Sequence, residues 1–195
     1  MRRKWGIFGL AMGISARTLL TCYLAAIFVS LPFLPVIVTW ARSRLGPSSI
    51  SLPLEALLVL CALLPALRLL RRPRPSPPWP HLAYVGLLFA ALATLSTLAS
   101  SPIGRVHLVE YGLLSILILR ALPPRNAGRY LVAFAIAATV GFADEIVQIA
   151  IPNRVFDWYD VGLNISAALL GSAAAAWWRW TAPGDGGTGG DGSSP

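Results

Sequence analysis

The segment 141–164, GFADEIVQIAIPNRVFDWYDVGLN, places two adjacent carboxylic acids inside an apolar run. A charged side chain at the middle of a bilayer costs about 3 kcal/mol on insertion scales, and such residues face a bundle interior or a wet cavity. Asp144 and Gln148 are four residues apart and share one face of a helix. Glu145 reaches that face through its three-residue spacing to Gln148. A proline then ends the helix, and the polar loop that follows carries Arg154. The segment therefore predicts a polar site at one surface of a membrane.

The composition of the whole chain indicates an integral membrane protein of the helical kind. Of its 195 residues, 56% are hydrophobic and 12% are charged, which is about half the charged fraction of a soluble domain. The apolar runs are continuous, which excludes the alternating strands of a membrane β-barrel. The formal net charge of +8 is distributed between these runs, so it indicates membrane topology and no nucleic-acid partner. Cys22 and Cys61 provide neither a disulfide framework nor a metal motif.

Hydrophobic runs predict an all-α, polytopic transmembrane helix bundle with about six spans, each of about 20 residues. The expected spans are 18–40, 52–70, 82–99, 106–122, 130–151 and 161–180. Pro32 and Pro35 are expected to bend the second half of the first span, because proline cannot donate the helical hydrogen bond. The last span carries a face of small residues that suits close helix packing. These residues are Ala167, Ala168, Gly171 and Ala175.

The chain divides into three parts on this interpretation. Residues 1–17 form a basic N-terminal leader, and residues 18–182 form the transmembrane helical domain. The tail 183–195 is rich in Gly, Ser and Asp and has nothing to bury, so we expect it to be disordered.

The distribution of lysine and arginine orients the six spans. With the N-terminus in the cytoplasm, twelve basic residues fall on the inner side: Arg2, Arg3, Lys4, Arg17, Arg68, Arg71, Arg72, Arg74, Arg120, Arg125, Arg129 and Arg179. Four fall on the outer side: Arg42, Arg44, Arg105 and Arg154. The positive-inside rule therefore predicts that both termini are cytoplasmic.

This topology brings the acidic residues to the outer side. Apart from two aspartates of the tail, every acid lies at the outer end of a span or beyond it: Glu55, Glu110, Asp144, Glu145, Asp157 and Asp160. At about 1.5 Å per helical residue, Glu110 and Asp144 lie at similar depths. The two can face each other if the fourth and fifth spans are neighbours, as their short connector indicates. The last three spans are therefore expected to enclose one outward-facing polar site.

The candidate site combines acid/base or ligand residues with binding residues. The first set is His107, Glu110, Asp144 and Glu145, and the second is Gln148, Arg154, Asp157, Asp160 and Asn164. His107 and Glu110 share a helix face, which suits an acid/base or ligand pair. Arg154 suits a phosphate or carboxylate, because its guanidinium is planar and always charged. The carboxylates suit a divalent cation such as Mg²⁺ or Ca²⁺, or acid/base work with His107.

Structural roles are open for several of these residues. Asp144, Glu145 and Arg154 also suit a buried ion pair that fixes the corner between the fifth and sixth spans. Asp157 or Asp160 also suits a cap at the start of the sixth span. The excess of acids favours function, since one arginine cannot neutralise six of them. The sequence has no nucleophile motif, phosphate loop or zinc signature, so whether the protein is an enzyme is left open.

Two segments resemble the VanZ-like family of bacterial membrane proteins. The first is RVHLVEYGLL at 105–114, and the second begins with DEIVQ at 144–148. The second segment continues through Pro152, Arg154, Asp157, Asp160, Asn164 and Gly171. The match covers roughly residues 105–171, within an expected family core of about 81–180, and the first two spans carry no recognisable family pattern. Val147 departs from the pattern, because many relatives carry a histidine there, and this weakens an interpretation that needs two histidines.

The resemblance implies a multi-pass protein of the bacterial cytoplasmic (inner) membrane. The founding member of that family is associated with resistance to the glycopeptide antibiotic teicoplanin, and such a role is the most that the resemblance implies. Together with the outward-facing site, it favours a protein that binds or modifies a membrane lipid or a lipid-linked envelope molecule. Two alternatives stay open: a structural or assembly subunit of a membrane complex, and a small proton-coupled transporter. The acids lie at one side instead of the midplane and the sequence shows no repeat, which argues against the transporter.

Overall fold

The protein is helical throughout the part of the chain that its structure, a computed structural model, describes. That part comprises residues 15–46, 48–70, 79–99, 101–123, 126–152 and 154–180, with the side chains of 61–70, 79–81 and 180 left aside. It contains seven α-helices and no strand, which confirms the predicted all-α class. Residues 1–14 of the expected leader and the expected tail 183–195 lie outside the described residues.

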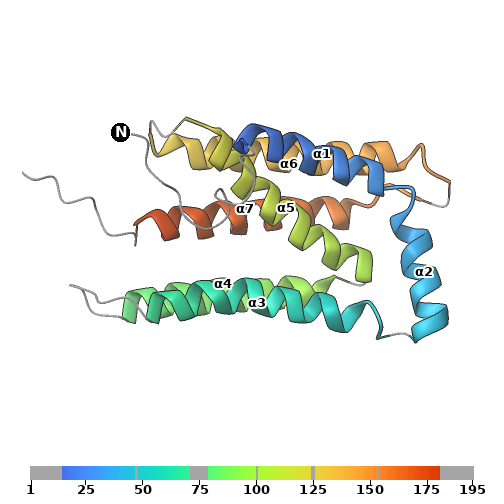
Figure 1. Cartoon of the computed structure of the whole chain (residues 1–195), viewed down its shortest axis with the longest axis horizontal. Helices are drawn as coiled ribbons and strands as arrows, with labels where there is room; N and C mark the ends of the chain where they lie inside the picture. The colour runs from blue at the N-terminus through green and yellow to red at the C-terminus, as the bar shows by residue number, and fades with distance from the viewer. Residues whose placement is uncertain are drawn as a thin grey trace, which may run out of the picture.

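The seven helices form an elongated bundle with one helix across its end. They are α1 (Ala16–Ser30), α2 (Leu34–Leu45), α3 (Ser51–Leu70), α4 (Trp79–Leu98), α5 (Pro102–Ala121), α6 (Gly128–Gln148) and α7 (Trp158–Trp180). Figure 1 shows α1, α3, α4, α6 and α7 along the long axis, α5 crossing them obliquely, and α2 lying across one end. Helices α1, α4 and α6 run towards the end where α2 lies, and α3, α5 and α7 run away from it (Figure 1).

The first predicted span is broken between α1 and α2. The chain leaves the helix at residues 31–33, and the two helices are bent by 65°. Pro32 lies in this break, and Pro35 lies in the first turn of α2, where a missing N–H breaks no helical bond. The predicted bend is therefore confirmed. Residues 34–45 leave the axis of α1 and lie across the end of the bundle (Figure 1).

Three helices are long and apolar enough to cross a membrane, namely α5, α6 and α7. The bent pair α1 and α2 makes a fourth if it counts as one span, and α3 and α4 contribute the shorter apolar segments Ser51–Leu60 and Leu82–Leu98. These figures refer to the described residues. The structure thus has the character of a helical membrane protein, whereas the number of six spans and the orientation of the termini stay predictions.

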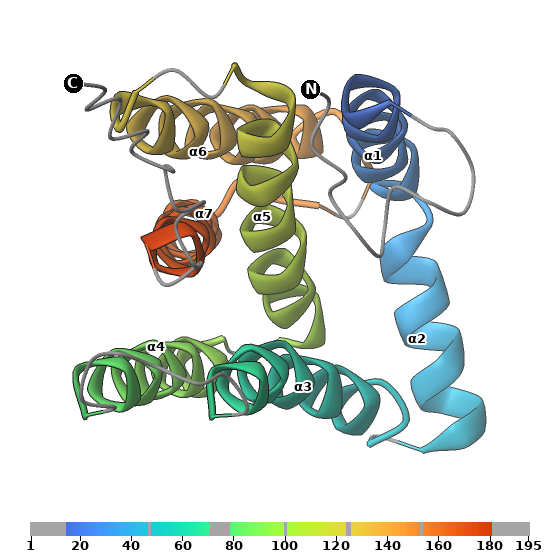
Figure 2. The same ribbon diagram turned by 60° about the vertical axis from the view of Figure 1, so that its left-hand side comes forward.

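Helix α5 is the centre of the bundle and contacts each of the other six helices. Figure 2 shows it in the middle, between the α3–α4 pair and α6. Its crossing with α7 is close: a Cβ added at Gly171 would overlap the backbone carbonyl of Gly112. Ala167 and Ala168 are buried in the same core, and Ala175 packs against it. The predicted small-residue face is therefore confirmed, and its partner is α5.

Candidate functional site

Helix α6 presents one buried face near its C-terminal end. Gly141, Asp144, Glu145 and Gln148 are all buried there, and their spacing of three and four residues places them on one side of the helix. Asp144 and Glu145 have no exposed surface. The predicted sharing of one helix face by both acids and the amide is what the structure shows.

Helix α5 presents a polar face to the buried face of α6. The Ser101 side chain caps the start of α5 by accepting a hydrogen bond from the Gly104 backbone N–H (3.0 Å), and Pro102 occupies the first turn. His107 and Tyr111, which are four residues apart on one face of this helix, point into the bundle, where they are 1% and 0% exposed. The polar faces of α5 and α6 therefore meet in the interior.

His107 lies between the two acids of α6. Its Nε2 is 3.9 Å from Asp144 Oδ2, and its Nδ1 is 4.0 Å from Glu145 Oε1. Both separations exceed a hydrogen bond. One ligand atom of each residue lies within 4.8 Å of the other two. The three side chains thus surround a small common space, and His107 forms no hydrogen bond with either acid.

Gln148 connects this cluster to Arg154. Its Nε2 donates to Asp144 Oδ2 (3.2 Å) and to Glu145 Oε1 (2.9 Å), and its Oε1 accepts from Arg154. This orientation of the amide is the one that chemistry requires, because carboxylates only accept and guanidinium only donates. The described residues contain no ion pair between Arg154 and either acid. The hypothesis of a direct buried ion pair at this corner is therefore replaced by a pairing through the amide.

Some buried polar atoms of the cluster lack a well-formed hydrogen bond within the described part of the chain. They are His107 Nδ1 and Arg154 Nε, whereas the Tyr111 hydroxyl and the Asp144 carboxylate interact with each other. Tyr111 was not among the predicted site residues, although it lies one turn after His107 and meets its ring edge to face, with 6.0 Å between centroids. The indication for it was its spacing of four residues from His107, which places both on one helix face.

The loop between α6 and α7 closes the cluster at the end of the bundle where α6 ends. The Asp157 backbone N–H donates to Glu145 Oε2 (3.4 Å), and the Asp157 side chain accepts from the Tyr159 backbone N–H (2.8 Å). Asp157 therefore caps α7, which was one of the two roles considered for it. Asp160, on the first turn of α7, is half-buried and faces Gly104 at the start of α5. Both aspartates lie at the rim, outside the buried cluster.

The remaining predicted residues lie near the cluster but serve other contacts. Glu110 is half-buried one turn after His107, and its carbonyl accepts from the Tyr23 hydroxyl (3.2 Å). Asn164 Nδ2 donates to the Gly141 carbonyl (3.0 Å), so it ties α7 to α6. Among the outer acids, Glu55 pairs with Arg105 at 2.8 Å. The structure therefore brings four predicted residues into one network with Arg154 and leaves the others around it.

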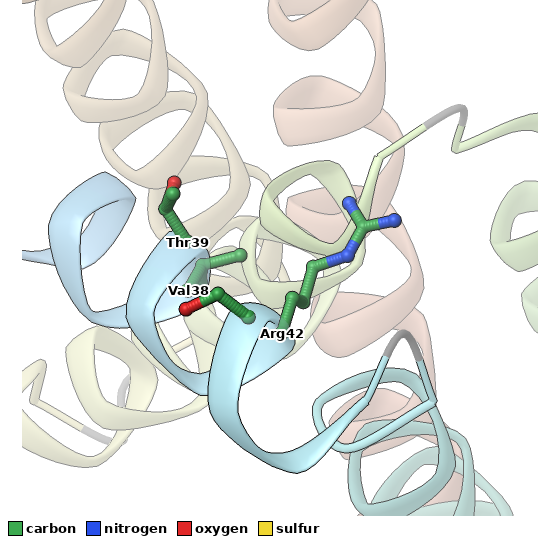
Figure 3. Close-up of a pocket in the computed structure, with 4 residues that line it drawn as sticks. Val38, Thr39 and Arg42 are labelled. Carbon is green, nitrogen blue, oxygen red and sulfur yellow. The ribbon is translucent and has the colours of Figure 1, made fainter.

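Two hollows at the surface of the described residues lie away from the cluster. Figure 3 shows one on α2, lined by Val38, Thr39, Arg42 and Ser43. A second lies between α4 and α7, beside Tyr84 and Trp177. Neither contains a predicted site residue. The candidate site is therefore a closed polar cluster that offers two carboxylates, an imidazole and, through an amide, a guanidinium.

Comparison with known proteins extends the family resemblance along the chain. The profile of the VanZ/LLP1 family matches residues 20–179, which is most of the chain. No curated protein and no solved structure gives a match. The match begins at residue 20, so it extends beyond the resembling segment 105–171 and includes the first two predicted spans. Those spans are apolar helices without polar motifs, and a motif search does not detect them.

Proposed function

Because the chain belongs to the VanZ/LLP1 family, we propose that it is a multi-pass membrane protein whose buried polar site binds the head group of an envelope amphiphile. In this proposal α1, α3, α4, α5, α6 and α7 each cross the bilayer once, and α2 lies at the outer surface. The alternation of helix direction in Figure 1 supports it. So do the lengths of α3 and α4, since each has 20 residues and spans about 30 Å.

The orientation can be tested by labelling single cysteines with a membrane-impermeant maleimide. Ser48 and Asn126 are exposed and lie in loops at opposite ends of the bundle. In a chain with Cys22→Ser and Cys61→Ser, Ser48→Cys should react in intact cells and Asn126→Cys only after lysis. The opposite pattern would reverse the topology and place the polar site on the cytoplasmic side.

The observation that carries the binding proposal is the incomplete hydrogen bonding of a fully buried cluster. An unpaired buried polar atom costs about 1–3 kcal/mol, and native proteins contain few of them. His107 Nδ1 is such an atom, and it faces Glu145 beside Asp144, whose carboxylate interacts with the Tyr111 hydroxyl. A corner built only for packing gains nothing from leaving the imidazole nitrogen unpaired, whereas a ligand completes its bonding.

Arg154 indicates the kind of head group. Its guanidinium is half-buried on the loop that closes the outer side of the site, and it contacts Gln148 instead of a carboxylate. A guanidinium that is not in direct contact with a carboxylate remains available to the oxygens of a phosphate, which it can bind with two parallel bonds. The proposed ligand is therefore a lipid whose head group carries a phosphate.

Binding can be measured with a short-chain polyprenyl phosphate and the full chain in nanodiscs. Arg154→Ala should weaken binding by about tenfold or more, the equivalent of losing one charge-assisted contact. Arg154→Lys should retain part of the affinity, because lysine keeps the positive charge but cannot form the two parallel hydrogen bonds of a guanidinium. Arg44→Ala is the matched control, since Arg44 is exposed on α2 near the same end. Equal affinity in all four proteins, or no binding, would refute the proposal.

A structural or assembly role is the second candidate, and one contact favours it. The Glu145 carboxylate accepts a hydrogen bond from the Asp157 backbone N–H, and the Asp157 side chain caps α7. On this hypothesis Glu145→Gln lowers thermal stability and lipid binding in parallel. On the binding hypothesis, Arg154→Ala lowers binding while the melting temperature stays close to that of Arg44→Ala. A resistance role is tested separately, by the teicoplanin susceptibility of cells that express the chain.

A further inference from the structure

We propose that His107, Asp144 and Glu145 bind one divalent transition-metal cation, of the kind represented by Zn²⁺. This inference concerns the same site as the proposed function and names a further ligand for it. The three residues come from two neighbouring helices, α5 and α6, and all three are buried.

The separations between the ligand atoms suit a single ion. Atoms bound to one metal at about 2.0–2.2 Å lie at most about 4.4 Å apart. One nitrogen of His107 and one oxygen of each acid lie within 4.8 Å of one another, which is slightly wider than this limit. A small inward rotation of one carboxylate brings all three onto one ion.

An unpartnered imidazole nitrogen points into this space. His107 is 1% exposed, and its Nδ1 has no hydrogen-bond partner although it faces Glu145. Asp144 is fully buried beside it, and its carboxylate also interacts with the Tyr111 hydroxyl. A neutral imidazole offers one lone pair, and a metal ion is the ligand that uses a lone pair of nitrogen and lone pairs of two carboxylates together.

The charge balance favours a dication. Asp144 and Glu145 lie side by side without exposed surface, and Arg154 reaches them only through Gln148. Two buried carboxylates without a direct counter-charge are strongly disfavoured in a medium of low polarity. One divalent cation between them neutralises both.

The type of ligand selects among divalent cations. Mg²⁺ and Ca²⁺ prefer oxygen ligands throughout, whereas imidazole suits Zn²⁺ and related transition-metal ions. Gln148 strengthens the arrangement, because its amide donates to the same two carboxylates and fixes their orientation. Such hydrogen bonds to metal-binding carboxylates typically change metal affinity by about 10–100-fold.

The test uses the full chain without a histidine tag, purified in detergent, with Zn²⁺ alone as the probe. We expect one Zn²⁺ per chain by elemental analysis, and an X-ray absorption spectrum with nitrogen and oxygen neighbours at about 2.0–2.2 Å, including an imidazole. His107→Gln and Asp144→Asn should lose at least tenfold in Zn²⁺ affinity by calorimetry. Glu55→Gln should bind as the wild type does, since Glu55 pairs with Arg105 outside the cluster.

The absorption spectrum keeps the proposal testable if a substituted protein does not fold, because it needs only the wild type. No stoichiometric Zn²⁺, a spectrum without imidazole, or equal affinity in His107→Gln would overturn the metal site. If polyprenyl phosphate binds while Zn²⁺ does not, only this inference fails. If Zn²⁺ binds while polyprenyl phosphate does not, only the proposed function fails.

Discussion

Helices α5, α6 and α7 differ from α1 to α4 in what they bury. Every buried polar side chain among the described residues belongs to the first group: His107, Ser115, Asp144, Glu145, Gln148, Asn164 and Ser172. In that group glycines let the helices approach closely, at the Gly171 crossing of α5 and where Gly141 of α6 meets Asn164 of α7. In the second group the buried side chains of the described residues are apolar, for example those of Ile27 and Leu58.

This comparison indicates that the buried polar site depends on the close packing of α5, α6 and α7. Small residues allow close backbone approach in membrane helices, where the hydrophobic effect does not drive association. That approach excludes lipid from the interface, so ionisable groups can be placed there. The α1–α4 part has no such enclosure and is suited to contact with lipid tails.

The largest effect on stability is expected from a substitution at Gly171, where α5 and α7 cross. In Gly171→Ala the new methyl group meets the Gly112 carbonyl and Ser115 Oγ, and backbone cannot yield cheaply. We expect a loss of about 3 kcal/mol in the free energy of unfolding, at the upper end of overpacking effects, measured by unfolding in detergent micelles.

Gly162→Ala is the matched control for that substitution. It lies on the same helix, and its added Cβ meets nothing within 4 Å, so it should be neutral or stabilise by up to about 1 kcal/mol. Equal stability of the two variants would show that α5 and α7 do not cross closely.

A second test makes the same substitution in both regions. In Gly141→Ala the new Cβ lies 2.7 Å from the Asn164 Cβ and 3.3 Å from two Tyr111 ring carbons. We expect a loss of about 1–3 kcal/mol. Gly86→Ala on α4 meets nothing within 4 Å and should not destabilise the protein. Similar melting curves for both variants would remove the distinction between the regions.

The smallest effect should come from the Arg105–Glu55 pair, which joins the two regions. The side chains of the pair are 23% and 47% exposed, and pairs of this kind contribute about 0–1 kcal/mol. Glu55→Gln should therefore lower the melting temperature slightly at low salt and leave it unchanged at high salt. A large loss at either salt concentration would mean that the two regions depend on this contact.

The sequence predicts what helical spacing determines. The face shared by Asp144, Glu145 and Gln148 follows from residue spacing alone, and the bend at Pro32 and Pro35 follows from proline chemistry. Residue spacing does not predict contacts between segments that are distant in the sequence. That α2 turns across the end of the bundle, and which of Asp157 and Asp160 caps α7, depend on how loops close over packed helices.

The same limit explains the Arg154 contact. Opposite charges in one short segment suggest a direct ion pair, but the loop conformation places the guanidinium against Gln148. Only coordinates show that an amide lies between them. The inclusion of Tyr111 could have been read from its spacing to His107, since the two residues share a helix face.

The amide of Gln148 separates the positive and negative charges of the site by the length of one side chain. Arg154 is half-buried on the loop, whereas both carboxylates are fully buried. In the two proposals the cation lies at the carboxylates and the phosphate at Arg154, so the two ligands use different atoms and do not compete for the same place.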